Sequence, residues 1–292
     1  MNLSVIIPNR NSPFATKTIQ DILEKATTEV EIIVNVDEKW PEPLLNDKRV
    51  TYVHPAVPKG MRAGINAGLA LARGKYVMKT DDHCMFDKGF DKVLTESCAE
   101  NWLMIPRRYS LDAEKWERDL TRPIRDYHYI CFPEQGKAHD FGMHGVEWRD
   151  RDRERTDPKY DLDNTPSWQG SMWFANKDYF MKHVGFLDDR IETYSTFAQE
   201  PQEIGMKYWL GGGAIKINKK TWYAHLHKGK RYGRMYHMDY HTVASHNWSA
   251  KHWMNDEEPG MIHTMEWFVN EKFPGMPTWP ENWADIWASY KT

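Results

Sequence analysis

The sequence predicts an α/β domain built on a mostly parallel sheet with helices on its faces. Three observations indicate this fold: a continuous apolar run near the N-terminus, further β-branched runs that alternate with segments of helical spacing, and polar residues directly after the runs. Together they give the order β-α-β-β-α-β, which is typical of such a sheet. A chain of 292 residues with 40% hydrophobic residues is long enough to bury this core.

Each element of the first third has its own local signal. Residues 3–7 are apolar and β-branched and end at Pro8, as a buried strand does. Ser12 and Pro13 then favour a helix start, with the proline at the first helical position. The next predicted elements are strands over 30–36 and 50–53, a helix over 61–73 with Gly74 as its C-terminal cap, and a strand over 76–78.

The second part of the chain is less regular. Residues 112–165 are charged, most densely at 149–155, and indicate either a solvated loop or salt-bridged helix face, or a mobile lid or acceptor-binding loop. A tail rich in histidine, tyrosine, lysine and finally tryptophan follows residue 228. Between them, order is predicted at 168–175, as helices near 177–183 and 199–210, and as short strands over 214–217 and 221–224.

Charge and cysteine content exclude several classes of protein. The 39 basic and 42 acidic residues give a formal net charge of −3, which argues against a surface that attracts nucleic acid or anionic lipid everywhere. The three cysteines form no C-x-x-C pair, so neither a disulfide framework nor a thiolate zinc site is indicated. No apolar run approaches the roughly 20 residues that span a bilayer, and no basic leader is evident. We therefore expect a soluble, cytoplasmic protein without stable membrane insertion; no oligomeric state is predicted.

An acidic and imidazole tripeptide follows the strand predicted at 76–78. Ligands of open α/β sheets bind at the carboxyl ends of strands, so Asp81, Asp82 and His83 are candidates to hold a divalent cation and, through it, a sugar diphosphate. In an extended segment the first and third residues point the same way, so Asp81 and His83 can share one ion while Asp82 faces elsewhere. Taken alone, the tripeptide is also a common turn sequence.

Four stretches in the first third carry a family resemblance. Residues 4–8, 34–37, 60–77 and 81–83 resemble, in order and spacing, the glycosyltransferase family 2 superfamily with its GT-A fold. The resemblance implies a glycosyltransferase, of hexosyl or N-acetylhexosaminyl type, whose donor is a nucleotide sugar, with a UDP-sugar as the expected one. It further implies a nucleotide-sugar-binding half (1–105) and an acceptor-binding half (106–230), which includes the charged insertion near 112–165. The resemblance does not extend to that insertion or to the aromatic and basic C-terminal extension (231–292).

The resemblance also implies roles for donor-side residues. Pro8, Arg10 and Asp37 would hold the nucleobase. Lys59 would lie near the donor phosphates, and the family's helix arginine and asparagine correspond to Arg62 and Asn66, while Asp81 and Asp82 complete the donor site. Each has an alternative reading, since Asp37 could cap a helix, Arg62 could be a surface residue, and Asn66 could be a hydrogen bonder on a helix face.

The metal motif departs from most of family 2. His83 stands where aspartate is usual, and Asp-x-His is similar to the motif of polypeptide N-acetylgalactosaminyltransferases. In those enzymes a later histidine completes the metal site, which implies His225 here, with His227 as the alternative. One carboxylate and two imidazoles suit Mn²⁺ better than Mg²⁺, so Mn²⁺ is the expected cofactor and Mg²⁺ the alternative.

A second departure concerns the catalytic base. Residues 200–212 resemble the family's acidic helix, but Pro201 occupies the usual position of the basic aspartate and cannot accept a proton. Either Glu200 or Glu203 would then serve as base, or the enzyme retains configuration and relies on the donor phosphate and metal. Inversion and retention both remain open.

The acceptor is the least determined part of the prediction. The acceptor-side segment supplies Trp168 and Gln169, and the basic and aromatic stretch 216–251 supplies Trp222, Lys228 and Arg231. Such side chains suit a hydroxymethylated pyrimidine in viral DNA, a glycan or a glycolipid, and they are also typical of solvated surface. A nucleotidyltransferase or a catalytically silent sugar-nucleotide-binding protein is the competing class, since one nucleotide-binding fold can serve several activities.

Overall fold

The computed structural model describes residues 1–135, 141–228, 232–233 and 240–290. The strands of its main sheet are β1 (Leu3–Asn9), β2 (Val30–Val36), β3 (Val50–Val53), β4 (Tyr76–Thr80), β5 (Cys84–Phe86), β6 (Trp102–Asp112), β7 (Glu117–Asp119), β10 (Leu162–Asn164), β11 (Met172–Asn176) and β12 (Ala214–His225). Their order is β10-β12-β6-β11-β4-β1-β2-β3, with β5 beside β12 and β7 beside β6. A separate pair joins β8 (His128–Ile130) and β9 (Gly145–Glu147).

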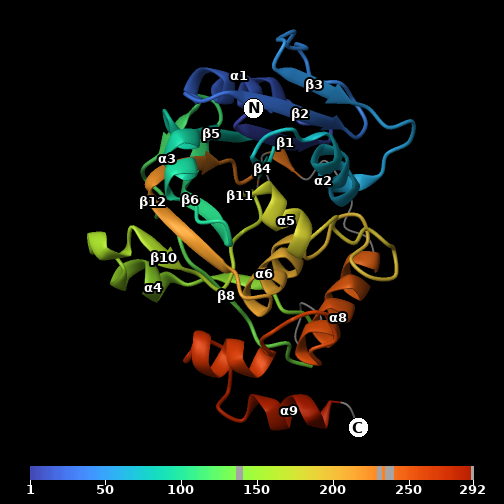
Figure 1. The fold of residues 1–292 in the computed structure, drawn as a ribbon, viewed down its shortest axis with the longest axis vertical. Helices are drawn as coiled ribbons and strands as arrows, with labels where there is room; N and C mark the ends of the chain where they lie inside the picture. Colours follow the sequence, from blue (N-terminus) through green and yellow to red (C-terminus); the bar gives the residue numbers. More distant parts are fainter. Residues whose placement is uncertain (136–140, 229–231, 234–239, 291–292) are drawn as a thin grey trace.

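Helices cover this sheet and extend it at one end (Figure 1). They are α1 (Ala15–Lys25), α2 (Gly60–Leu71), α3 (Phe90–Ser97), α4 (Arg149–Glu154), α5 (Lys177–His183), α6 (Glu200–Leu210), α8 (Tyr240–Met254) and α9 (Trp283–Ser289), with single-turn helices at Pro158–Tyr160 and Trp267–Lys272. The C-terminal helices α8 and α9 lie at the opposite end of the molecule from α1 and β3. No helix among the described residues has both the length and the apolar character needed to cross a bilayer.

The prediction of a mostly parallel sheet is confirmed. β1 runs parallel to both β2 and β4, β2 is parallel to β3, and β12 is parallel to β6. β11 runs antiparallel between β4 and β6, and the short strands β5, β7 and β10 also pair antiparallel. Since β1, β2 and β4 point the same way, their carboxyl ends meet at one edge of the sheet and bring the residues that follow them together.

The apolar run of β1 is buried on both of its faces. Ile6 belongs to one apolar cluster, and its neighbours Val5 and Ile7 belong to another on the opposite side of the sheet. All three side chains are fully buried. A strand covered on both faces needs a continuous apolar sequence rather than an alternating one. The continuous N-terminal run therefore correctly predicts a strand in the interior of the sheet.

Two predicted helix boundaries are wrong. α1 begins at Ala15, not at Pro13, because the Ser12 hydroxyl accepts the backbone N–H of Phe14 (3.3 Å) and holds a turn before the helix. α2 ends at Leu71 with an extended residue after it, so Gly74 is not its cap. Gly74 instead packs against β1, where its N–H donates to the Ser4 hydroxyl (2.8 Å) and a Cβ would lie 2.6 Å from the Ser4 backbone nitrogen.

Strands are also longer than predicted. β4 continues past Met78 through Lys79 to Thr80, because the polar side chain of Lys79 finds buried partners described below. The two strands predicted at 214–217 and 221–224 form the single strand β12, whose pairing with β6 shifts register between Asn218 and Trp222. The polar residues between them mark a bulge rather than the end of a strand.

The charged stretch at 149–155 forms the short helix α4 on the surface. Arg149 lies 3.5 Å from a carboxylate oxygen of Glu147, and Arg151 lies 3.7 Å from Asp163. The charged stretch therefore forms a salt-bridged helix face, which belongs to the first of the two alternatives left open by the sequence.

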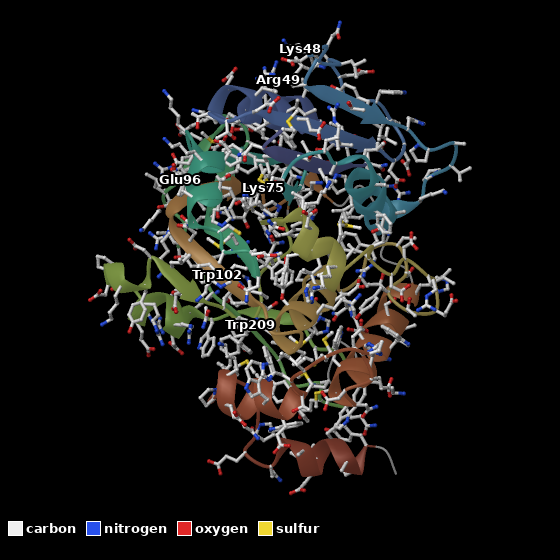
Figure 2. The ribbon with its side chains drawn as sticks, viewed as in Figure 1. Lys48, Arg49, Lys75, Glu96, Trp102 and Trp209 are labelled. Atoms are coloured by element: carbon white, nitrogen blue, oxygen red, sulfur yellow. The ribbon has the colours of Figure 1, made fainter. Side chains whose placement is uncertain are left out.

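The tryptophan-rich C-terminal region packs onto the body of the protein. Trp209 of α6 lies beside this region (Figure 2). Its ring meets that of Phe273 edge-on, with ring centroids 5.0 Å apart. Trp279 donates its indole N–H to the carbonyl of Ile130 (2.6 Å). Trp253 is fully buried. These rings supply core packing for the region beyond α6.

Asparagine in place of Asp21 is expected to stabilise the fold at alkaline pH but not at acidic pH. Burial raises the pKa of Asp21 to about 6, although its carboxylate accepts the backbone N–H of Phe86 (2.7 Å). The folded state thus binds this proton more tightly than the unfolded state, and stability falls as pH rises through about 4 to 6. The side-chain amide of the variant accepts the same hydrogen bond without a charge. The free energy of unfolding of the variant, relative to that of the wild type, should therefore rise by up to about 3 kcal/mol between pH 4 and pH 8.

Urea unfolding of both proteins at the two pH values measures this difference. The exposed Asp285, replaced by asparagine, is the control for a carboxylate lost from a helix surface. Parallel pH profiles for the wild type and the Asp21→Asn variant would contradict the expectation.

Candidate metal centre and its cleft

A cleft of about 630 Å³ opens at the carboxyl ends of β1, β2 and β4. Its opposite wall comes from the end of β12 and the start of α6. Of the residues predicted from the sequence, the lining includes Pro8, Arg10, Asp37, Asp81, Asp82, His83, Gln169, Glu200, His225, His227 and Lys228. A volume of this size accommodates a ligand as large as a nucleotide.

Asp81, His83 and His225 converge on one point in this cleft. Nε2 of His225 lies 3.2 Å from Oδ2 of Asp81 and 3.0 Å from Nε2 of His83. One ligand atom from each of the three residues lies within 4.8 Å of the others. The pairing of β5 with β12 causes this convergence, because it places His225 opposite Cys84, next to the tripeptide.

Asp82 orients the imidazole of His83. Its Oδ1 lies 2.6 Å from Nδ1 of His83, and its Oδ2 accepts a hydrogen bond from the side-chain amide of Asn9 (2.9 Å). A carboxylate at Nδ1 fixes the proton there, so the lone pair of Nε2 faces Asp81 and His225. Asp82 and His83 lie in a turn rather than in an extended segment, and Asp82 is not among the three residues whose ligand atoms converge.

The protonation states suit a cation. Burial lowers the pKa of His225 to about 3, so its imidazole is neutral at ordinary pH. For Asp81, burial favours the neutral acid, but the combined effect of Lys79 and the two histidines lowers the pKa below its usual range. An ionised carboxylate and two imidazole rings whose nitrogens converge on one point fit a divalent metal of intermediate softness, such as Mn²⁺.

Asp37 caps the helix α2 from within the cleft. Its Oδ1 accepts the backbone N–H groups of Lys59 (2.7 Å) and Gly60 (3.1 Å). Gly60 has a φ of 86°, and a Cβ there would lie 2.5 Å from Cβ of Thr196, so only glycine permits this approach. The helix-cap alternative for Asp37 is therefore realised, while its carboxylate still lines the cleft.

Arg10 is held at the same end of the cleft by Glu38, a residue without a predicted role. Its Nε donates to Glu38 (2.7 Å) and lies 3.8 Å from Oδ2 of Asp37. Glu38 also accepts a hydrogen bond from the side-chain amide of Asn11. The predicted nucleobase residues Pro8, Arg10 and Asp37 thus lie together.

Lys59 and Asn66 do not line the cleft. Lys59 is exposed, and its contact with Asp37 is made through the backbone. Asn66 holds the backbone of Leu187 from both sides, donating to its carbonyl and accepting its N–H, each at 2.8 Å. Asn66 therefore acts as the hydrogen bonder on a helix face that the sequence offered as an alternative.

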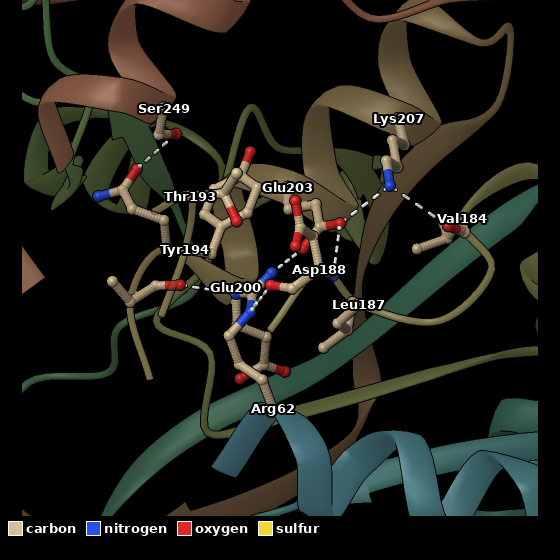
Figure 3. A network of polar contacts seen from close by, with 12 residues as sticks. Arg62, Val184, Leu187, Asp188, Thr193, Tyr194, Glu200, Glu203, Lys207 and Ser249 are labelled. Atoms are coloured by element: carbon tan, nitrogen blue, oxygen red, sulfur yellow. Dashed lines mark hydrogen bonds and ion pairs between the residues drawn. The ribbon is translucent and has the colours of Figure 1, made fainter. Parts of the chain in front are cut away.

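Arg62 is fully buried at the centre of a polar network between α2 and α6 (Figure 3). Its guanidinium donates to the carbonyls of Asp188 (2.7 Å) and Ala198 (2.6 Å) and forms an ion pair with Glu203. Its Cζ lies 4.4 Å from the ring centroid of Tyr194. The alternative of a surface residue is wrong, and the predicted donor contact is not among these interactions.

The two glutamates of α6 differ in position. Glu200 lines the cleft, where its Oε1 accepts the indole N–H of Trp173 (2.7 Å) and its Oε2 accepts from Lys79 (3.2 Å). Glu203 is buried away from the lining and pairs with Arg62 and Lys207. Glu200 is therefore the one of the pair that a bound acceptor could reach.

The residues predicted for acceptor binding separate into three groups. Gln169 and Lys228 line the cleft, and Nζ of Lys228 lies 4.0 Å from Oδ1 of Asp82. Trp168 is buried in the core, and Trp222 packs against Tyr109 and Arg118 rather than in the cleft. Arg231 lies outside the described residues.

Asn9 and Lys79 both line the cleft, but sequence reasoning assigned a role to neither. Asn9 ends β1 and orients Asp82, and its only signal is its place after an apolar run. Lys79 offers a clearer signal, because a charged residue inside an otherwise buried strand requires partners.

Comparisons with known proteins show the family and the fold of this chain. The profile described as Glycosyl transferase family 2 matches residues 4–184, more than half of the sequence. The chain therefore belongs to glycosyltransferase family 2, as the resemblance predicted. No curated protein sequence matches it.

Solved structures match at low sequence identity. A crystal structure of GalNAc-T7 with UDP, GalNAc and Mn²⁺ matches with a TM-score of 0.66 and 14% identity, over 99% of this chain and 55% of that one. TarS of S. aureus matches with a TM-score of 0.49 and 14% identity, over 78% and 37%. The first match confirms the predicted GT-A fold. This chain spans about half the length of that GalNAc-T7 chain.

Proposed function

We propose that this chain is a cation-dependent glycosyltransferase that moves a sugar from a UDP-sugar to an acceptor hydroxyl. The observation that carries the proposal is the convergence of Asp81, His83 and His225 inside the cleft. The presence of UDP, GalNAc and Mn²⁺ in the GalNAc-T7 structure, which shares the fold, supports Mn²⁺ and a UDP-sugar of N-acetylhexosaminyl type.

The donor is proposed to lie along the carboxyl ends of β1, β2 and β4. Pro8, Arg10 and Asp37 would contact its nucleobase, and the diphosphate would lie between Asp81 and Lys228, whose ammonium reaches the same side as Asp82. A divalent cation, when bound, neutralises the diphosphate and stabilises it as the leaving group. Lys59, Arg62 and Asn66 have no donor contact in this proposal.

Asp82 and Asn9 have supporting roles in it. By holding the proton of His83 at Nδ1, they keep Nε2 available as a ligand. Loss of such a supporting carboxylate typically lowers metal affinity by about 10–100-fold.

Glu200 is proposed to face the acceptor. Each of its oxygens accepts one hydrogen bond from the protein, which leaves further lone pairs for an acceptor hydroxyl. The carboxylate would orient that hydroxyl and receive its proton as the new glycosidic bond forms. Glu203, whose partners are Arg62 and Lys207, has a structural role instead.

Removal of the metal provides the first test. We expect the purified chain to release UDP slowly from one member of a UDP-sugar panel in the presence of Mn²⁺, and this release to stop with a chelator and return with excess Mn²⁺. Chelator-resistant release would contradict the proposal. Pyrophosphate formation from a sugar phosphate and a nucleoside triphosphate would instead indicate a nucleotidyltransferase.

The acceptor can be sought in the same reaction. The protein and the active UDP-sugar are incubated with hydroxymethylpyrimidine DNA, with glycans and with glycolipid head groups. The mass of each product is then measured by mass spectrometry. A mass increase of one sugar identifies the acceptor class, and the anomeric configuration of that product distinguishes inversion from retention.

A further inference from the structure

Lys79 is a buried ammonium directly behind the metal centre. It lies in β4 with 1% of its surface exposed, among strands that are otherwise apolar. Its Nζ lies 2.8 Å from Oδ1 of Asp81, 2.7 Å from the carbonyl of Gly170 and 3.2 Å from Oε2 of Glu200. An ammonium has three protons to donate, so each of them has an acceptor.

These contacts divide the two oxygens of Asp81. Oδ1 is taken by Lys79, whereas Oδ2 faces the histidines, at 3.2 Å from Nε2 of His225 and 3.9 Å from Nε2 of His83. Oδ1 keeps a second lone pair, but a cation bound to it as well would come close to the Lys79 ammonium, whose like charge repels it. Asp81 therefore offers the point where the three ligands converge one favourable oxygen, Oδ2.

The ammonium is also held in place from the other side. Gly170 has a φ of 83° and packs against the ring of Pro201, so its carbonyl is fixed by a tight loop. Glu200 is fixed in turn by the indole of Trp173. Lys79 therefore cannot turn away and release Oδ1 without leaving a buried charge unpaired.

The number of oxygens that a carboxylate offers affects which cations it prefers. Ca²⁺ takes six to eight oxygen ligands and readily accepts both oxygens of one carboxylate, whereas smaller ions with stricter geometry bind one oxygen each. We propose that Lys79 restricts Asp81 to single-oxygen coordination and thereby makes the centre select Mn²⁺ over Ca²⁺. This inference rests on the proposed function, since it assigns a selectivity to the same metal centre.

The test measures cation binding rather than turnover. Mn²⁺ affinity of the full chain is determined by electron paramagnetic resonance, and Ca²⁺ is titrated as a competitor, for the wild type and for Lys79→Met. Methionine preserves most of the side-chain length but frees Oδ1 of Asp81. We expect the ratio of Mn²⁺ to Ca²⁺ affinity to fall by at least about tenfold in the variant.

Two further variants make the result decisive. Lys207→Met removes another poorly exposed ammonium, one that pairs with Glu203 outside the cleft, and should leave the ratio unchanged. The double variant Lys79→Met, Glu200→Gln removes the ammonium together with the charge of its partner Glu200. It is measured in place of Lys79→Met if the single variant does not fold.

The outcomes separate the two proposals. An unchanged ratio, or an equal loss of affinity for both cations, overturns the role of Lys79. Absence of Mn²⁺ binding by the folded wild type overturns the metal centre itself and hence the proposed function.

Discussion

Alanine in place of Asp81 is expected to lower cation-dependent release of UDP by at least about 10³-fold, which corresponds to about 4 kcal/mol of transition-state stabilisation. The substitution removes the carboxylate oxygen that faces both His83 and His225. It also leaves Lys79 with one carboxylate instead of two. Both changes weaken the hold on a cation, so affinity for Mn²⁺ and turnover should fall together.

The measurement is the initial rate of UDP release over a series of Mn²⁺ concentrations. Asp47→Ala is the matched control, since it removes an aspartate that pairs with Arg49 and does not line the cleft. Circular dichroism verifies that both variants are folded. Wild-type turnover by Asp81→Ala would exclude the proposed centre.

Methionine in place of Arg62 is expected to lower the free energy of unfolding by about 3–5 kcal/mol. Arg62 and Glu203 are both buried, so loss of the guanidinium leaves a carboxylate without its main partner in the interior. The carbonyls of Asp188 and Ala198 also lose their donor. Equilibrium unfolding in urea measures the loss.

A matched substitution isolates the effect of burial. Arg73 also pairs with a buried carboxylate, that of Glu31, but its own side chain is 72% exposed, so Arg73→Met should change stability far less. Replacing Glu203 by leucine together with Arg62→Met should restore part of the lost stability, because no buried charge then remains unpaired. If Arg62 bound the donor instead, its variant would raise the KM for UDP-sugar and unfold like the wild type.

The centre itself was predictable because its ligands follow strands. Asp81 and His83 come after the strand β4, whose apolar sequence marks it, and the sheet then determines where they lie. The assignment of His225 comes from family resemblance rather than from pattern. The pairing of β5 with β12 that brings it to Asp81 has no signal in the sequence alone.

The remaining differences have a common physical cause. Arg62, Lys79 and Asn66 are polar residues whose partners are backbone carbonyls or distant carboxylates. Sequence patterns report where apolar side chains face, but they do not report which buried acceptor a charged side chain will meet. From such patterns a polar residue is assigned to the surface or to ligand binding, and the predicted strand ends before Lys79.

His83 and His225 touch across 142 residues of chain. The pairing of β12 with β5 brings these rings together, so a cation that needs both of them binds only to forms of the chain in which the two strands are paired. By mass action such a cation lowers the population of every form in which they are separate. Metal concentration and the stability of the sheet are then thermodynamically linked.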